Sequence, residues 1–175
     1  MIILKSYKEL EKFKKIIPAD KNDGHYDIVL YEITENGKPA DVVFDFAFNF
    51  SYMIYHNENL LEDDIDNNNV EGKLIAKDIT FNYFVDIDFI EAENINIKKE
   101  CKVKYIKVKN EISGFKVVAQ DIMAKVISCK YVYATWLYCK DLECELLGLS
   151  DKEFKNIKAE NIQSCGAFKE NDLPF

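Results

Sequence analysis

Glycine, proline and histidine are scarce in this chain, which has 6 glycines, 3 prolines and 2 histidines among 175 residues. No glycine-rich fingerprint for phosphate occurs, which disfavours the common nucleotide-binding enzymes. No apolar run approaches the roughly 18 residues of a membrane-spanning helix. The start, MIILKSYKELEKF, lacks the apolar core and cleavage site of a signal peptide. We therefore expect a cytoplasmic protein that makes no membrane contact.

Positive charge is also in short supply, since 23 basic residues face 31 acidic residues and the net charge is −8. This balance disfavours direct binding to nucleic acid phosphates. Residues 58–71 hold six acids and no basic residue, and we predict a solvated acidic connector there that doubles as a candidate binding surface. The six acids are Glu58, Glu62, Asp63, Asp64, Asp66 and Glu71.

Metal-binding patterns are weak throughout the chain. The spacing Asp64-x-Asp66-x-Asn68 resembles part of a calcium loop, but the glycine and the terminal glutamate of such loops are missing. The five cysteines, Cys101, Cys129, Cys139, Cys144 and Cys165, form no CxxC pair. We expect no metal and no cofactor, and we expect the cysteines to be small buried side chains in a reducing compartment.

A five-residue period is the strongest pattern in the sequence. From residue 119 the chain divides into AQDIM AKVIS CKYVY ATWLY CKDLE CELLG. The first position of each pentad holds a small residue, and the fourth holds an aliphatic one. The aliphatic residues are Ile122, Ile127, Val132, Leu137, Leu142 and Leu147. Looser pairs of the form aliphatic-x-small run upstream to Leu74-x-Ala76. Only Asp86 places a charge in such a pair, and a slipped register or a loop explains it best.

Neither a helix nor a flat strand can bury a five-residue period on one face, because five steps rotate a helix by about 140° and reverse the face of a strand. A chain that turns a corner every five residues can send residues i and i+2 inward on each side. Four such sides would give a square coil of about twenty residues, with successive coils stacked at the strand spacing. We predict this coil over residues 72–149.

In this respect the sequence resembles the pentapeptide-repeat proteins, and in residue order it is most similar to uncharacterised Ile-x-Ala-x-x repeat proteins of Clostridium-like bacteria and their phages. The resemblance implies a mainly β fold, namely a short single-stranded right-handed quadrilateral β-helix. It also implies scaffold or binding behaviour without catalysis. Some family members mimic DNA through continuous acidic surface, whereas residues 114–149 carry balanced charge.

Both ends of such a coil need caps. Residues 1–57 predict an α+β cap with a helix from Ser6 to Pro18, a strand from Tyr26 to Ile33, a turn over residues 35–39 and an apolar strand from Phe44 to Ile54. Residues 150–175 are expected to form a C-terminal cap and tail. Ser150 to Ile162 would form either a last irregular turn of the coil or a capping helix that begins at Ser150, and we favour the helix.

One candidate interface is aromatic. Outward or corner positions of the pentads hold Val126, Tyr131, Tyr133, Trp136 and Tyr138. A contiguous patch of this kind would indicate a protein partner or self-association. The alternative is that the rings lie under the C-terminal tail or stack on one another.

We expect a non-catalytic binding or assembly module. One alternative is a phage or defence-related inhibitor that uses its acidic surface to mimic nucleic acid and occupy a DNA- or RNA-processing enzyme. The other is an enzyme with a site between cap and coil, near His25 or His56, although neither histidine has a recognisable nucleophile or metal partner.

Overall fold

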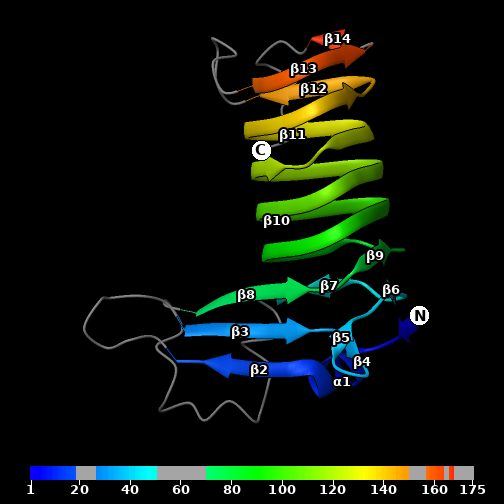
Figure 1. Ribbon diagram of the computed structural model, residues 1–175, viewed down its shortest axis with the longest axis vertical. Helices are drawn as coiled ribbons and strands as arrows, with labels where there is room; N and C mark the ends of the chain where they lie inside the picture. Colours follow the sequence, from blue (N-terminus) through cyan, green and yellow to red (C-terminus); the bar gives the residue numbers. More distant parts are fainter. Residues whose placement is uncertain (19–26, 51–69, 150–156, 164–165, 168–175) are drawn as a thin grey trace.

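The computed structural model of the chain describes residues 1–18, 27–50, 70–149, 157–163 and 166–167. These residues are mainly β-strand, as expected, and nearly all of the strands belong to one curled twelve-stranded sheet. Figure 1 shows the chain winding upward, with each turn lying on the one before it. None of the described helices is long and apolar enough to cross a membrane.

The centre of the sheet is formed by two long strands, β10 (Val85–Met123) and β11 (Val126–Glu143), which bend at corners as they wind. β8 (Val70–Ile75) and β9 (Asp78–Phe81) lie on the N-terminal side of β10, and β12 (Leu146–Leu149), β13 (Ile157–Gln163) and β14 (Gly166–Ala167) follow β11. All pairings among these strands are parallel. Parallel neighbours are what a chain that keeps winding in one direction produces.

The pairing register measures the length of one turn. Glu111 pairs with Val126 and Tyr131 with Leu146, which is fifteen residues along the chain in both cases. Asn94 pairs with Asp78, sixteen residues before it. Fifteen residues hold three of the five-residue sides, so the register contradicts the predicted four-sided turn of about twenty residues. A longer step of twenty residues occurs in the last described turn, where Leu137 pairs with Ile157.

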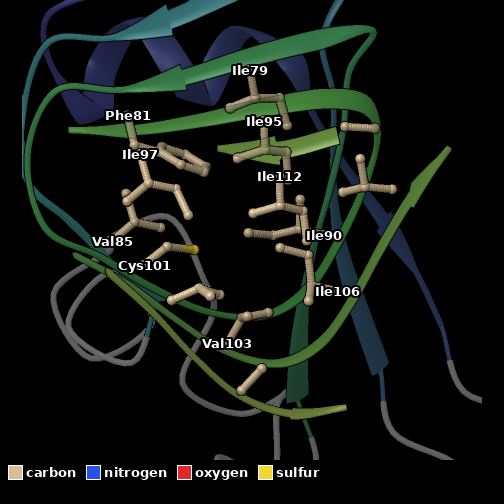
Figure 2. Packing of buried hydrophobic residues seen from close by; sticks show 14 of the residues in the cluster. Ile79, Phe81, Val85, Ile90, Ile95, Ile97, Cys101, Val103, Ile106 and Ile112 are labelled. Atoms are coloured by element: carbon tan, nitrogen blue, oxygen red, sulfur yellow. The ribbon is translucent and has the colours of Figure 1, made fainter. Parts of the chain in front are cut away.

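The interior of the coil is filled by the predicted inward pairs. Ile122, Ala124, Ile127 and Cys129 are all less than 9% exposed, and the upstream pairs from Leu74 onward are buried in the same way. Figure 2 shows upstream members of this set, such as Ile79, Ile95 and Ile112, pointing inward from successive turns. The small residue of each pair leaves room for the aliphatic residues of the neighbouring sides in a narrow, closely packed interior.

Asp86 does not point into this interior. Val85 and Ile87 are buried instead, and the Asp86 carboxylate lies 3.5 Å from Nζ of Lys102 on the next turn. The pattern is shifted by one residue at this corner, which confirms the predicted slip of register. Because the side-chain period of a strand is two, a shift of one residue exchanges the inward and outward sets.

The N-terminal strands extend the same wall. β6 (Val42–Phe44) pairs in parallel with β9, and β1 (Ile2–Leu4) pairs with β6. β3 (Asp27–Glu32), which confirms the predicted strand, pairs in parallel with β8. A hairpin of β4 (Thr34–Glu35) and β5 (Lys38–Pro39) confirms the predicted turn, with positive φ at Asn36 and Gly37 as a tight hairpin turn requires.

The helix predicted from Ser6 to Pro18 is wrong over most of its length. The chain forms α1 (Tyr7–Leu10), a single 3₁₀ turn (Glu11–Phe13) and then β2 (Lys14–Ile17), which pairs antiparallel with β3. Ile16 and Ile17 are β-branched and favour the strand, and β3 supplies hydrogen-bond partners for their backbone. Side-chain burial does not explain why a strand forms here in place of a helix, because Ile16 and Ile17 are both about half exposed.

Aromatic rings fill the N-terminal end of the coil. Phe44 lies with its ring centroid 5.2 Å from that of Phe81, and Tyr7 lies 5.2 Å from Phe46. β7 (Phe48–Asn49) pairs with β10 at Val85 and places Phe48 among these rings. The predicted apolar strand is therefore divided into β6 and β7 up to residue 50, and residues 51–54 lie outside the described part of the chain.

The helix predicted to begin at Ser150 is wrong for residues 157–162, which belong to β13 and pair with β11. Ala159 of this strand packs against the core. The remaining residues of the predicted C-terminal cap, apart from β14, lie outside the described residues.

Gly114 allows two turns to approach each other. Its φ is +129°, and a Cβ atom at this position would lie 2.0 Å from the carbonyl oxygen of Ile97 on the preceding turn. We expect Gly114→Ala to lower the free energy of unfolding by about 3 kcal/mol, measured by urea denaturation, because both the steric overlap and the backbone conformation penalise a side chain. Gly37→Ala is the control, since no atom lies within 4 Å there, and it should cost about 1 kcal/mol. Equal losses in the two variants would contradict this account.

Removal of one whole turn should leave a folded protein. Deletion of residues 112–126 joins Glu111 to Ile127, and because Ile127 pairs with Ile112 in the register, every later side chain keeps its side of the coil. We expect this variant to retain a β-type circular dichroism spectrum and cooperative unfolding. Deletion of residues 117–126 is the control, since it shifts all later residues to a different side. Cooperative unfolding of both variants with equal midpoints would contradict a fifteen-residue turn.

Candidate functional site

A groove on one side of the coil is the most developed site among the described residues. It crosses several turns, is open to solvent and has a volume of about 550 Å³. Its walls are Lys73, Phe89, Ile90, Glu91, Tyr105, Ile106, Lys107, Asp121, Ile122, Met123, Trp136 and Tyr138. The lining is mainly aromatic and aliphatic, with a few charged groups.

The stacking of turns assembles this groove from two columns of outward residues. Phe89, Tyr105, Asp121 and Trp136 each come directly before an inward aliphatic residue, and Met123 and Tyr138 come directly after one. Asp121 pairs with Trp136 and Met123 with Tyr138 in the register. Residues fifteen or sixteen positions apart in the sequence thus become direct neighbours on the wall.

The rings of the groove are partly exposed. Phe89 and Tyr105 stack with centroids 5.0 Å apart and an interplanar angle of 16°. Trp136 is 42% exposed and Met123 is 52% exposed. Large exposed apolar side chains that share one concave surface are typical of protein interfaces.

Asp121 lies between the aromatic residues and is incompletely satisfied. Its Oδ1 atom is buried and has no hydrogen-bond partner among the described residues. Loss of water around this carboxylate raises its pKa above the usual value for aspartate. A buried polar atom without a partner is uncommon in folded proteins because it costs free energy.

The other charges of the groove are paired. Glu91 accepts ion pairs from Lys73 at 3.3 Å and from Lys107 at 3.8 Å, so one carboxylate holds both lysines. No ion pair reaches Asp121 within the described part of the chain. Asp121 is therefore the carboxylate of the groove that has capacity for a further charged partner.

The structure divides the predicted aromatic interface among different sides of the coil. Trp136 and Tyr138 line the groove together. Tyr131 and Tyr133 flank the inward Val132 on the preceding side. Tyr131 packs edge-on against Phe115, and Tyr133 lies under Nζ of Lys116 at 5.4 Å.

Val126, the fifth predicted residue, belongs to neither of these two sides. It lines a second groove of about 440 Å³ with Asp141, Leu142, Glu143, Glu160, Asn161 and Ile162. In this groove the amide of Asn161 donates to Asp141 Oδ1 at 2.7 Å. No cluster of three or more metal-ligating side chains occurs among the described residues.

Five of the six predicted acidic residues, Glu58, Glu62, Asp63, Asp64 and Asp66, lie outside the described residues, as do His25 and His56. Glu71 lies on β8, where its carboxylate is 3.6 Å from Nζ of Lys104. Lys104 also pairs with Asp88 at 2.7 Å. Glu71 thus takes part in a charge ladder between turns and does not present free acidic surface.

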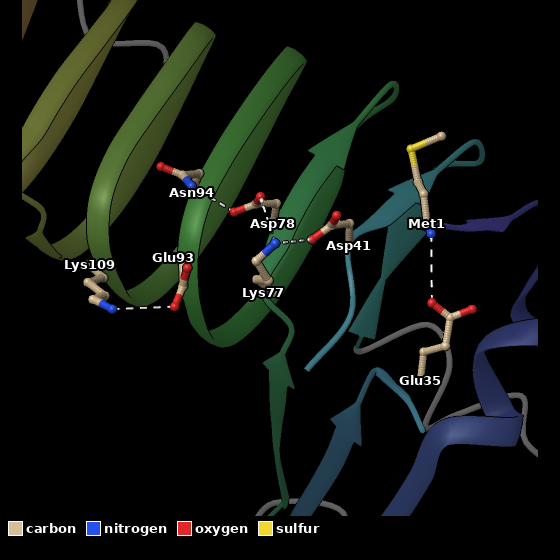
Figure 3. Close-up of polar contacts among 8 residues, drawn as sticks. All are labelled: Met1, Glu35, Asp41, Lys77, Asp78, Glu93, Asn94 and Lys109. Carbon is tan, nitrogen blue, oxygen red and sulfur yellow. Dashed lines mark hydrogen bonds and ion pairs between the residues drawn. The ribbon is translucent and has the colours of Figure 1, made fainter. Parts of the chain in front are cut away.

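Similar ladders follow the outer wall of the coil, where they neutralise its acids. Lys77 pairs with Asp41, and Lys109 pairs with Glu93 on the preceding turn. Figure 3 shows these pairs and the neighbouring hydrogen bond from Asn94 to Asp78. Exposed ion pairs add little to stability, but here each one sets a lysine beside an acid on the described part of the wall.

Four of the cysteines, Cys101, Cys129, Cys139 and Cys144, are buried, as predicted, and Cys165 lies outside the described residues. Burial raises the pKa of Cys129 to about 12 and shifts that of Cys101 upward as well. These thiols are protonated at neutral pH, and the groove contains none of them.

Phe89, Tyr105, Asp121 and Met123 were not predicted as site residues. The signal that identifies them is their spacing of fifteen or sixteen residues at equivalent outward positions. That spacing has meaning only when one turn is known to hold three sides, because a turn of twenty residues aligns different outward residues with one another.

No protein-family model, no curated protein and no solved structure matches this chain. The relationship to pentapeptide-repeat proteins stays a prediction.

Asp121→Asn should change how stability depends on pH. The folded-state pKa of Asp121 is raised, so the unfolded chain loses this proton first as the pH rises, and ionisation of Asp121 opposes folding above that range. We therefore expect the variant to be at least as stable as wild type at pH 7, with the difference shrinking as the pH falls below the folded-state pKa. Thermal unfolding between pH 3 and pH 7 measures this difference.

Asp86→Asn is the matched control, because it removes the same charge from an ion pair with Lys102. It should not stabilise the protein at pH 7. A loss of stability at pH 7 in Asp121→Asn would show that its carboxylate is better satisfied than the unpartnered Oδ1 atom indicates.

Proposed function

We propose that the chain is a short right-handed β-helix with three sides per turn that acts as a non-catalytic binding module, and that the groove face contacts another protein. The handedness follows from a general rule, since connections between parallel strands of one sheet are right-handed in about 98% of cases. The inward pairs at five-residue spacing and the fifteen-residue register support three sides.

The observation that carries the proposed function is the open groove with exposed Trp136 and Met123 and half-buried Tyr105 along its walls. Tryptophan and tyrosine are enriched among the residues that dominate binding energy at interfaces. The groove residues stand on strands fixed by pairing on both sides, so little conformational entropy is lost when a partner binds. A rigid wall with exposed aromatic rings is suited to binding another protein.

The groove's chemistry favours binding over catalysis. Its lining contains no histidine, the most common general acid or base, and no cysteine, serine or threonine to act as a nucleophile. The paired Glu91 is held by two lysines. Aromatic contact area and one free carboxylate are features of a recognition surface.

The test combines solution mass with peptide selection. Light scattering first gives the mass of wild type, of Trp136→Ala/Tyr138→Ala and of the control Phe115→Ala/Tyr131→Ala, which truncates two rings on another side. A phage-displayed random peptide library is then selected on wild type, with the Trp136→Ala/Tyr138→Ala variant used for counter-selection. Circular dichroism confirms that each variant is folded.

We expect either a dimer that only the groove variant dissociates, or a monomer that enriches peptides whose affinity falls by about tenfold or more in the groove variant and not in the control. A monomer that enriches no peptide overturns the proposal. So does binding that is equal in the groove variant and wild type.

A further inference from the structure

The position of Asp121 within the groove gives the site a chemical preference. In its column of outward residues, Tyr105 lies on the turn before Asp121 and Trp136 lies on the turn after it. The carboxylate is thus flanked by an aromatic ring on either side along the axis of the coil. Its Oδ1 atom lacks a hydrogen-bond partner among the described residues.

We infer that the groove takes an arginine side chain from a partner protein, with the guanidinium donating to Asp121 and lying between the rings of Tyr105 and Trp136. This inference rests on the proposed function, because it names the chemistry of the partner at the same groove. The pair would give the Asp121 carboxylate the charged partner that no ion pair among the described residues supplies.

The spacing of the turns suits a planar cation. Neighbouring turns lie about 4.8 Å apart, so Tyr105 and Trp136, two turns apart, are separated by about 10 Å at the wall. A planar group in van der Waals contact with a ring on each side needs about 7–8 Å. The gap therefore admits one guanidinium over Asp121, with one of its faces in contact with an aromatic ring.

Arginine matches these contacts better than lysine. A guanidinium is planar, stacks on aromatic rings and donates two parallel hydrogen bonds to one carboxylate, whereas an ammonium is compact and strongly hydrated. A positive charge is also attracted to the negative face of an aromatic ring. The groove's own lysines, Lys73 and Lys107, are both held by Glu91 and form no ion pair with Asp121.

A second copy of this chain cannot supply the ligand. All 23 of its basic residues are lysines, and the sequence contains no arginine. The partner is therefore a different protein that presents an arginine at its surface. This point separates the inference from self-association, which would also place a protein at the groove.

The experiment uses Trp136 as its reporter, since it is the one tryptophan in the chain. The full-length protein is titrated with an acetylated, amidated peptide GSGRGSG, and with the same peptide carrying lysine or citrulline in place of arginine. Citrulline keeps the shape of the side chain and removes its charge. Binding is followed by Trp136 fluorescence and confirmed by calorimetry.

We expect a saturable signal with the arginine peptide and an affinity about tenfold or more lower for the citrulline peptide, with lysine in between. Asp121→Asn should lower the affinity for the arginine peptide by a similar factor and abolish the difference between arginine and citrulline. Asp86→Asn, which makes the same change in net charge away from the groove, should bind like wild type.

Equal affinity for arginine and citrulline peptides, or for arginine and lysine peptides, overturns the inference, as does unchanged binding by Asp121→Asn. If library peptides without arginine bind the groove while the arginine peptide does not, the proposed function stands and the arginine site falls. If neither binds and the protein is a monomer, both fall.

Discussion

The stacking of each turn on the one before it is the interaction on which the rest of this structure depends. The pairings of β10 with β8, β9 and β11 join residues fifteen or sixteen positions apart, so the wall closes only if each turn has the right length. The interior is narrow enough that backbone and side chain touch across it and between turns. At Gly114 even one added carbon would overlap Ile97. Register and core composition therefore specify each other, since a shift of one residue would send charged side chains inward.

The same stacking determines what the outside of the coil can do. Residues that are far apart in sequence become neighbours at one turn's spacing, which aligns Lys104 with Asp88 in a charge ladder and Phe89 with Tyr105 in a ring stack. The interior constrains only the inward positions, so the outward columns are free to carry recognition. The groove arises where two such columns hold large apolar residues beside smaller charged ones.

The interior could be predicted from the sequence, because the i and i+2 pairs follow from the local geometry of a single five-residue side. Even the displaced pair at Asp86 could be recognised, since an unpaired inward carboxylate would be costly. The number of sides per turn could not be predicted in the same way. Each pentad has the same inward pair whether the chain closes after three corners or after four. The alignment of outward residues depends on that number, which is why Trp136 and Tyr138 were identified but their neighbours Tyr105 and Asp121 were not.

The N-terminal segment shows a different limit. Leu10, Phe13, Ile16 and Ile17 have helical spacing, yet the chain leaves the helix after one turn and enters β2. Helical spacing takes account only of where side chains lie. In the folded coil, however, β3 supplies hydrogen-bond partners for the backbone of Ile16 and Ile17. Where tertiary hydrogen bonding competes with local propensity over so short a segment, the tertiary partner decides.

Asp121 makes folding less favourable, but the same carboxylate suits the binding of a cation. The coil needs no charge at this outward position, and the same column holds the rings of Phe89, Tyr105 and Trp136 as well as Lys73. A carboxylate whose Oδ1 atom is buried without a partner, and whose pKa is raised by loss of water, makes folding less favourable at neutral pH. Groups that oppose folding in this way are concentrated at functional sites, because a ligand that completes them recovers the lost free energy on binding. The rings of Tyr105 and Trp136 would exclude water from a cation bound at Asp121. Loss of this water strengthens the attraction between the carboxylate and the cation. In the proposed binding mode, specificity depends on one carboxylate and affinity depends on the rings around it.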